Sequence, residues 1–319
     1  MMLPADPFHF PSLVWDWPIA IYLFLLGISA GSVTFAVLLK QKVLGDKASQ
    51  SGVLKATAIL GPASVVLGLL ILIFHLSRPW TFWKLMFHYQ FDSVMSMGVM
   101  LFQVYMAVLF VWLGGVFASE LAWLRERLLP GRFGWVDGLL ARIPSVDKMV
   151  EPLLLLLAVL LGAYTGFLLS ALKSYPMLNN PVLPVLFLVS GLSSGVASCI
   201  LVSTTLFKTR AHSDEVQFLH RFETPLVLIE ALLLLCFFTG LWFGDGQKLV
   251  ALISAIGGGF WSQVFWFGVV GLGLAAPLLL GRLLPGHGRG KLLLICGCSL
   301  TGILLLRYFI LYAGQMTVA

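Results

Sequence analysis

Eight long apolar runs, separated by shorter polar connections, dominate the pattern of hydrophobic and polar positions along the chain. A helix needs about 20 apolar residues to cross ~30 Å of hydrocarbon. Runs of this length predict an all-α integral membrane protein in which residues 1–319 form a single polytopic membrane domain. The eight transmembrane helices are expected near 18–40, 54–76, 93–116, 151–172, 183–207, 223–243, 260–281 and 291–313.

The basic residues of the connections predict the orientation of these helices. Fifteen Lys and Arg residues lie in the connections between helices one and two, three and four, five and six, and seven and eight. The opposite side holds only Arg78, Lys84, Lys173 and Lys248. Because cytoplasmic loops carry the excess of Lys and Arg, we expect both termini to be periplasmic, in the inner (cytoplasmic) membrane of a bacterium.

Two further patterns bear on the architecture. The connection 117–150 mixes Trp and Leu with Arg and Glu, which is typical of a short amphipathic helix lying on the cytoplasmic surface. Helices one and five contain the stretches GISAG at 27–31 and GLSSG at 191–195, a G-x-x-x-G pattern that lets helices approach closely. Since these two helices point the same way, we expect two four-helix bundles related by a parallel repeat.

Composition narrows the classes of function. The chain is 59% hydrophobic and only 11% charged, whereas soluble domains carry about 25% charged residues. The net charge of +6 is explained by basic cytoplasmic loops, so we expect the lipid bilayer as a partner and no nucleic acid. The four cysteines lie in apolar runs without a C-x-x-C pair, and only His75 among six histidines ends such a run. We therefore expect no haem, no iron–sulfur cluster and no metal in this chain.

Three glutamates lie on the cytoplasmic side of the predicted helices. Glu151 and Glu223 are expected to open their helices, where the helix dipole favours a carboxylate and a capping role is the simple interpretation. Glu230 lies deeper, where a charged side chain costs at least ~2.5 kcal/mol. It is either a paired structural acid or, together with Glu223, part of a proton path.

The connection HLSRPWTFWKLMFHYQFD, residues 75–92, gathers ionisable groups on the outer side. Its tryptophans fit an aromatic belt at the membrane interface. His75 and Asp92 instead lie at helix ends beside apolar sequence, where an imidazole and a half-buried carboxylate are suited to accept protons from a quinol. Arg78 would stabilise the quinolate, and Lys84 and His88 would contact a docked partner.

Long stretches of the chain resemble the NrfD family of membrane subunits, which includes the polysulfide reductase membrane subunit. The resemblance runs through nearly the whole chain. It is carried by WDWPIAIYLFLLGISAG at 15–31, HLSRPWTFWKLMFH and SVMSMGVMLFQ within 75–103, LLGAYTGFLLSALKSYPMLNNPVLPVLFLVSG at 160–191, GGGFW at 257–261 and RYFILYAGQ at 307–315.

The resemblance implies a membrane quinol-oxidising subunit that binds menaquinol or menaquinone and holds no cofactor of its own. Its partner would be an NrfC-like periplasmic protein with four iron–sulfur clusters. Electrons would then pass to a multihaem cytochrome c and to a nitrite reductase that forms ammonium. Two alternatives stay open: a membrane subunit of another oxidoreductase such as polysulfide reductase, and a proton-translocating module coupled to it.

The resemblance also implies a location for the quinol. Polysulfide reductase-like relatives bind the quinone head among helices one to four, close to the iron–sulfur partner. On this sequence, the outer ends of those helices supply Tyr22, His75, Asp92 and Lys173, with Tyr164 deeper in the membrane.

Overall fold

A computed structural model describes residues 6–76, 78–128, 138, 147–283 and 288–318. Within these residues, eight helical segments are long and apolar enough to cross a membrane, which confirms the predicted fold class. The segments are α1 (Trp17–Leu39), α2 (Gly52–His75), α4 (Val94–Val116), α7 (Asp147–Ser170), α8 (Leu183–Thr205), α9 (Asp214–Trp242), the consecutive helices α11 (Phe260–Gln263), η5 (Val264–Ala275) and α12 (Ala276–Leu283), and α13 (Arg289–Gln315).

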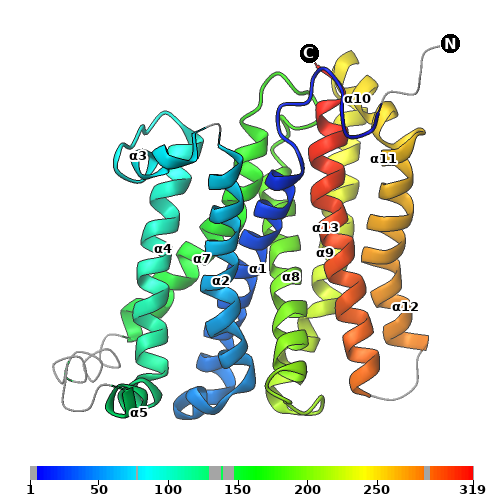
Figure 1. Ribbon diagram of the computed structural model, residues 1–319. Helices are drawn as coiled ribbons and strands as arrows, with labels where there is room; N and C mark the ends of the chain where they lie inside the picture. The colour runs from blue at the N-terminus through cyan, green and yellow to red at the C-terminus, as the bar shows by residue number, and fades with distance from the viewer. Residues whose placement is uncertain (1–5, 77, 129–137, 139–146, 284–287, 319) are drawn as a thin grey trace.

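The helices run up and down in two groups of four, shown in Figure 1. In one group α1 packs against α2 and α7, and α4 packs against α7; in the other α8 packs against α9 and α13, and α13 against η5. Helix α8 also packs against α1, α7 and α2, so the two groups share one continuous interface. Both termini lie at the same end of the bundle, which we call the outer end after its predicted periplasmic location, and we call the opposite end the inner end.

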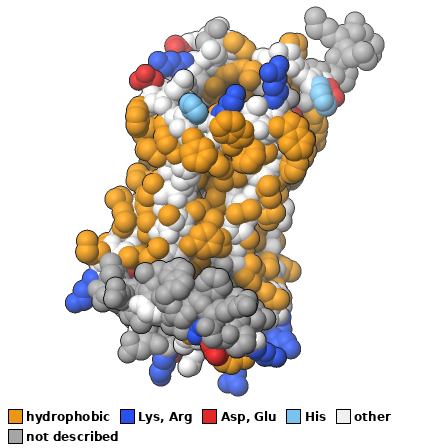
Figure 2. Space-filling view, turned by 60° about the vertical axis from the view of Figure 1, so that its left-hand side comes forward, with side chains coloured by type: hydrophobic (Ala, Val, Ile, Leu, Met, Phe, Trp, Pro, Cys, Tyr) orange, Lys and Arg blue, Asp and Glu red, His pale blue; other side chains and the backbone are white. Residues whose placement is uncertain are grey.

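Apolar side chains cover the middle of the molecule, and charged side chains gather at its two ends, as Figure 2 shows. A surface of this kind matches a hydrocarbon layer bounded on both sides by water. Because no water is available in that layer, each backbone amide must be satisfied within its own helix. The helical spans therefore follow directly from the apolar runs of the sequence.

The contact between α1 and α8 depends on the two G-x-x-x-G stretches. A Cβ atom placed on Gly31 would lie 2.3 Å from the carbonyl oxygen of Gly191 and 2.9 Å from the Cα of Gly195. A Cβ atom on Gly27 would lie 3.1 Å from the Cα of Gly191. The two stretches therefore pack backbone against backbone, and their similarity in sequence reflects a shared interface.

Buried polar side chains tie the first group of helices together. Ser29 of α1 donates a hydrogen bond of 2.7 Å to the carbonyl oxygen of Gly61 in α2, and its hydroxyl lies 2.9 Å from that of Tyr105 in α4. At the inner end, the Glu151 carboxylate of α7 lies 2.8 Å from the Lys40 ammonium, which follows α1. These contacts connect all four helices of the group, because interhelical hydrogen bonds hold helices together where lipid gives no hydrophobic drive.

The segment before α1 crosses the outer end and binds to the end of α13. The fully buried Gln315 accepts hydrogen bonds of 2.9 Å from the backbone N–H groups of Val14 and Trp15 through its side-chain oxygen. The indole of Trp261 donates a 2.9 Å hydrogen bond to the carbonyl oxygen of Pro7. The first and last helices are therefore fastened to each other at the outer end.

The predicted capping roles of Glu151 and Glu223 are wrong. Helix α9 begins at Asp214 rather than near residue 223, and Glu223 lies inside it, in contact with His220. Helix α7 begins at Asp147, and Glu151 pairs with Lys40 instead of capping. The start of α9 was missed because residues 214–222 are largely polar and do not extend the apolar run. Ser213 followed by two acidic residues is nevertheless a helix-start signal.

Shorter helices lie in the connections. Helix α3 (Phe82–Phe87) lies in the outer connection after α2, and α10 (Gly246–Ile256) lies between α9 and α11. Helix α5 (Ala118–Leu128) follows α4 at the inner end, in agreement with the amphipathic helix predicted for 117–150. Residues 129–137 and 139–146 of that connection lie outside the described residues.

We expect Gly31→Ala to lower the free energy of unfolding by about 1–3 kcal/mol. The new methyl group would meet backbone atoms of α8, and that overlap cannot be relieved by moving a side chain. Thermal unfolding in detergent measures the effect. Gly297→Ala is the matched control, since it is also helical and a Cβ atom there meets nothing within 4 Å. Equal unfolding temperatures for the two variants would contradict the proposed backbone contact.

Candidate functional site

A lipid-facing groove between α4 and α7 brings together two of the predicted site residues. The groove has a volume of about 570 Å³ and contains Asp92 at its outer end and Tyr164 further in. Apolar side chains make up the rest of its lining, including Met97, Leu157 and Phe167. The groove therefore offers one carboxylate and one phenol beside an apolar channel, and we call it the α4–α7 groove.

Tyr164 is held in this position by close packing from two helices. A Cβ atom on Gly98 of α4 would lie only 2.0 Å from the ring carbon that bears the Tyr164 hydroxyl, so the glycine makes room for the ring. Phe102 packs edge-on against both Tyr164 and Tyr22, with ring centroids 5.4 Å and 6.2 Å away. The hydroxyl groups of Tyr22 and Tyr164 also interact. The predicted pair Tyr22 and Tyr164 thus forms one polar unit behind the groove.

Asp92 is exposed and lies two residues before Val94, the first residue of α4. Ser93 caps that helix by accepting the backbone N–H of Ser96, at 3.5 Å. Asp92 itself makes no hydrogen bond or ion pair within the described part of the chain. Asp92 is therefore placed to accept a proton or a hydrogen bond from a bound molecule.

His75 lies beside a carboxylate that was not among the predicted site residues. Its Nε2 atom lies 3.0 Å from the carboxylate of Asp16, the residue that precedes α1. The pair joins the last residue of α2 to the start of α1 at the outer end. Sequence reasoning left Asp16 out of the site, although an acidic residue before Trp17 and Pro18 is a helix-start signal that points to the end of α1.

The remaining outer candidates are exposed, on loops or, for Lys84, in the short helix α3. Arg78 precedes a single helical turn, η3 (Pro79–Thr81), and Lys173 follows α7. Lys84 and His88 line a second outer cavity of about 550 Å³ together with Gln90. Trp80, in the same connection, is 88% exposed. This connection presents cations and aromatic rings outward, as a membrane interface or a docked protein requires.

The second group of helices contains buried charge at membrane depth. Arg307 of α13 is fully buried; its Nη2 atom donates to the Ser190 hydroxyl at 2.7 Å and to the Phe187 carbonyl at 3.0 Å. The Nε and Nη1 atoms of Arg307 have no partner within the described residues. Glu230 of α9 is only 3% exposed and lies within electrostatic reach of Arg307. Such groups inside a membrane are rare and are functional candidates.

The comparisons with known proteins agree with this architecture. The sequence profile of the family described as polysulphide reductase, NrfD matches residues 5–319. Protein NrfD of Escherichia coli (strain K12) is 57% identical over 319 residues, covering 100% of both proteins. The NrfD homolog of Haemophilus influenzae is 50% identical over 98% of each protein, and the C subunit of polysulfide reductase from Wolinella succinogenes is 39% identical over 96% of each.

The family profile spans almost all of this chain, and these relatives match it along nearly their full length. Together with the eight apolar spans, the matches place the protein in the bacterial inner membrane as a multi-pass protein. The chain belongs to the NrfD/polysulphide reductase family of membrane subunits.

Proposed function

We propose that this chain is the quinol-oxidising membrane subunit of a multi-subunit oxidoreductase and that it binds menaquinol in the α4–α7 groove. The observation that carries the proposal is that Asp92 and Tyr164 both line one apolar, lipid-open groove. Small-molecule sites have volumes of about 300–1,000 Å³ and a few placed polar groups, and the groove fits both criteria. A quinol that diffuses in the bilayer would enter it sideways.

Oxidation of a quinol releases two protons and two electrons. In our proposal the Asp92 carboxylate accepts the proton of one hydroxyl group, and the Tyr164 hydroxyl, backed by Tyr22, holds the other oxygen by a hydrogen bond. The pair of His75 and Asp16, at the same end of the bundle, receives the second proton and passes it to water. Arg78 and Lys173 supply positive charge that favours the quinolate over the quinol.

The electrons leave the protein one at a time to an iron–sulfur cluster of a partner, because a cluster of this kind accepts single electrons. We place the NrfC-like partner with its four clusters over the outer end, in contact with Lys84 and His88 beside the exposed Trp80. In the proposed pathway a multihaem cytochrome c and a nitrite reductase that forms ammonium follow the partner. The proposal assigns no haem, cluster or metal to this chain.

The likeness to the polysulfide reductase C subunit leaves polysulfide as an alternative terminal acceptor to nitrite, since the partner proteins carry out the chemistry of the acceptor. The likeness to the two NrfD proteins, at 57% and 50% identity, favours nitrite. A subunit that served only as a membrane anchor would carry no quinone. Organic extraction of the purified complex, followed by quinone analysis, distinguishes the two roles.

We expect Asp92→Asn to lower menaquinol-driven reduction of the partner's clusters about 100-fold, the usual contribution of a general base. Tyr164→Phe should lower it about 10-fold by removing one hydrogen bond to the substrate. Stopped-flow spectroscopy of the purified complex follows the reduction. Asp245→Asn, which keeps a capping residue at the outer end, and Tyr308→Phe are the controls. Unchanged rates in both groove variants would remove the assignment of the site.

We expect His75→Ala and Asp16→Asn to slow the same reaction by similar factors, each about 10-fold, because the carboxylate orients the imidazole. The double variant should be no slower than the worse single variant, since the two groups act as one unit. His9→Ala is the matched control, because His9 forms an exposed pair with Asp6 at 3.2 Å. Independent, multiplying effects of the two substitutions would argue against a shared proton acceptor.

A second function, proton translocation, is favoured by the buried Glu230 near Arg307 and by the pair of His220 and Glu223 closer to the inner end. If Glu230 carries protons, Glu230→Gln in reconstituted vesicles should abolish most of the membrane potential and leave cluster reduction unchanged. A potential-sensitive dye measures this, with the exposed Glu126→Gln as the control. Identical potentials in the wild type and in Glu230→Gln would exclude a Glu230 path.

A further inference from the structure

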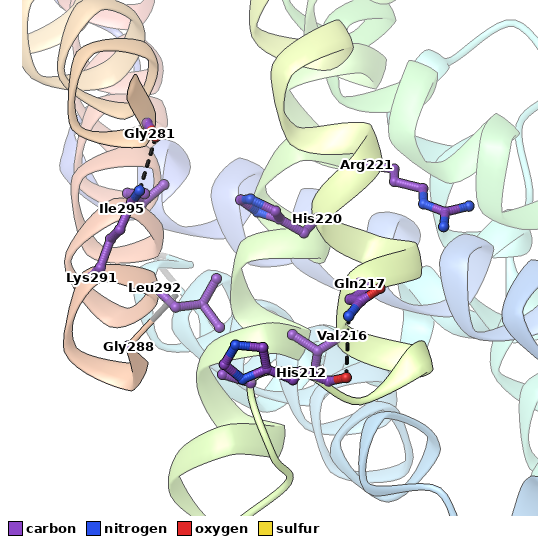
Figure 3. Close-up of a pocket in the computed structure, with 11 residues that line it drawn as sticks. His212, Val216, Gln217, His220, Arg221, Gly281, Gly288, Lys291, Leu292 and Ile295 are labelled. Atoms are coloured by element: carbon purple, nitrogen blue, oxygen red, sulfur yellow. Dashed lines mark hydrogen bonds between the residues drawn. The ribbon is translucent and has the colours of Figure 1, made fainter. Parts of the chain in front are cut away.

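A cavity at the inner end shares only His220 with the groups that the two proposed functions use. It has a volume of about 500 Å³ and lies between the first turns of α9 and the start of α13, as Figure 3 shows. We call it the α9–α13 cavity. Its basic groups are His212, His220 and Lys291, and its wall on the α13 side is formed by Leu292 and Ile295.

The basic side chains border the cavity from different elements. His212 comes from the connection before α9, His220 extends from α9 toward α13, and Lys291 belongs to the first turn of α13 (Figure 3). The Lys291 ammonium donates a hydrogen bond of 2.9 Å to the carbonyl oxygen of Gly281 in α12. Arg221 lines the cavity too, but its side chain turns to the other side of α9.

The α9–α13 cavity continues into the membrane. A second cavity of about 170 Å³ shares His220, Gly281 and Ile295 with it. The deeper part is bounded by Val227 of α9 and by Leu278 of α12. The two cavities together have a basic entrance at the inner end. Further in, between α9, α12 and α13, the lining combines the apolar Val227, Leu278 and Ile295 with Glu223, Thr224 and Arg282.

The charges at the entrance favour an anion. The one carboxylate that lines the deeper cavity, Glu223, is paired with His220 and also contacts the thiol of Cys296. Lys291 lies at the entrance, and Arg282 lines the deeper cavity. Within the described lining of the two cavities, these two cations accompany a single carboxylate, Glu223. Basic pockets between membrane helices on the cytoplasmic side are sites for anionic lipid head groups.

We propose that the α9–α13 cavity binds one anionic phospholipid, with its phosphate at Lys291 and His212 and one acyl chain between α9 and α12. A free phosphate ion would use the basic entrance and leave the deeper part unfilled, whereas a lipid fills both parts. Leu279 and Leu283 of α12 are exposed and provide an apolar surface for the second acyl chain. The lipid would fasten α12 to α9, which otherwise lie on two sides of the cavity.

The test uses the detergent-purified complex after partial removal of lipid. Native mass spectrometry measures the binding of phosphatidylglycerol and of phosphatidylcholine with identical acyl groups, and inorganic phosphate is added as a competitor. We expect phosphatidylglycerol to bind about 10-fold more tightly than phosphatidylcholine, the factor that corresponds to one charge-assisted contact. Millimolar inorganic phosphate should displace little of it.

The variants separate the head group from the acyl chain. Lys291→Gln combined with His212→Gln should lower the affinity for phosphatidylglycerol about 10-fold. Leu278→Trp, which fills the deeper cavity without changing any charge, should lower it to a similar extent. Lys42→Gln removes a charge from an exposed position near the inner end and should leave it unchanged. Circular dichroism confirms that each variant is folded.

Three results would overturn the proposal. Equal affinity of the wild type for the two lipids would show that no anionic site exists, whatever the variants do. An equal loss of affinity in Lys42→Gln would show attraction by the surface as a whole. Full affinity in Leu278→Trp, with ready displacement by inorganic phosphate, would show a site for a free anion and not for a lipid.

Discussion

The backbone contact between α1 and α8 is the interaction on which the rest of the structure depends. Gly27 and Gly31 of α1 face Gly191 and Gly195 of α8 so closely that a methyl group at Gly31 would overlap a backbone carbonyl. In a bilayer, apolar side chains gain little by leaving lipid for protein, so helices associate through close packing and hydrogen bonds. The glycine contact lets α1 and α8 lie at the centre, and the other six spans pack around them.

Several polar groups of the described residues have partners on other helices, so a polar side chain without such a partner is a candidate for binding a ligand. Ser29 binds Gly61 and Tyr105, and Glu151 binds Lys40, so these groups hold helices together. Asp92 has no such partner in the described part of the chain and borders an apolar groove. A carboxylate kept available beside a lipid-open groove is the arrangement that a proton acceptor for a membrane-soluble quinol needs.

The sequence predicted the positions of the spans well because the bilayer imposes a single strong rule. Apolar runs of about 20 residues become helices almost regardless of their neighbours. The first span, expected at 18–40, is observed at Trp17–Leu39. The rule fails where a helix extends beyond the hydrocarbon layer, since polar residues no longer count against it there. Helix α9 therefore begins at Asp214, and Glu223 lies within it rather than at its start.

By itself, the sequence determined the fold class, the eight spans and the concentration of ionisable groups at the outer end, because each follows from local composition and from the cost of burying charge. Only the tertiary structure decided which of those groups meet. It paired His75 with Asp16 and brought Asp92 and Tyr164, 72 positions apart in sequence, to one groove. Such partnerships depend on how the helices pack and rotate against each other. The glycine contact of α1 with α8 sets that packing, and the G-x-x-x-G pattern by itself does not say which helix meets which or in what rotation.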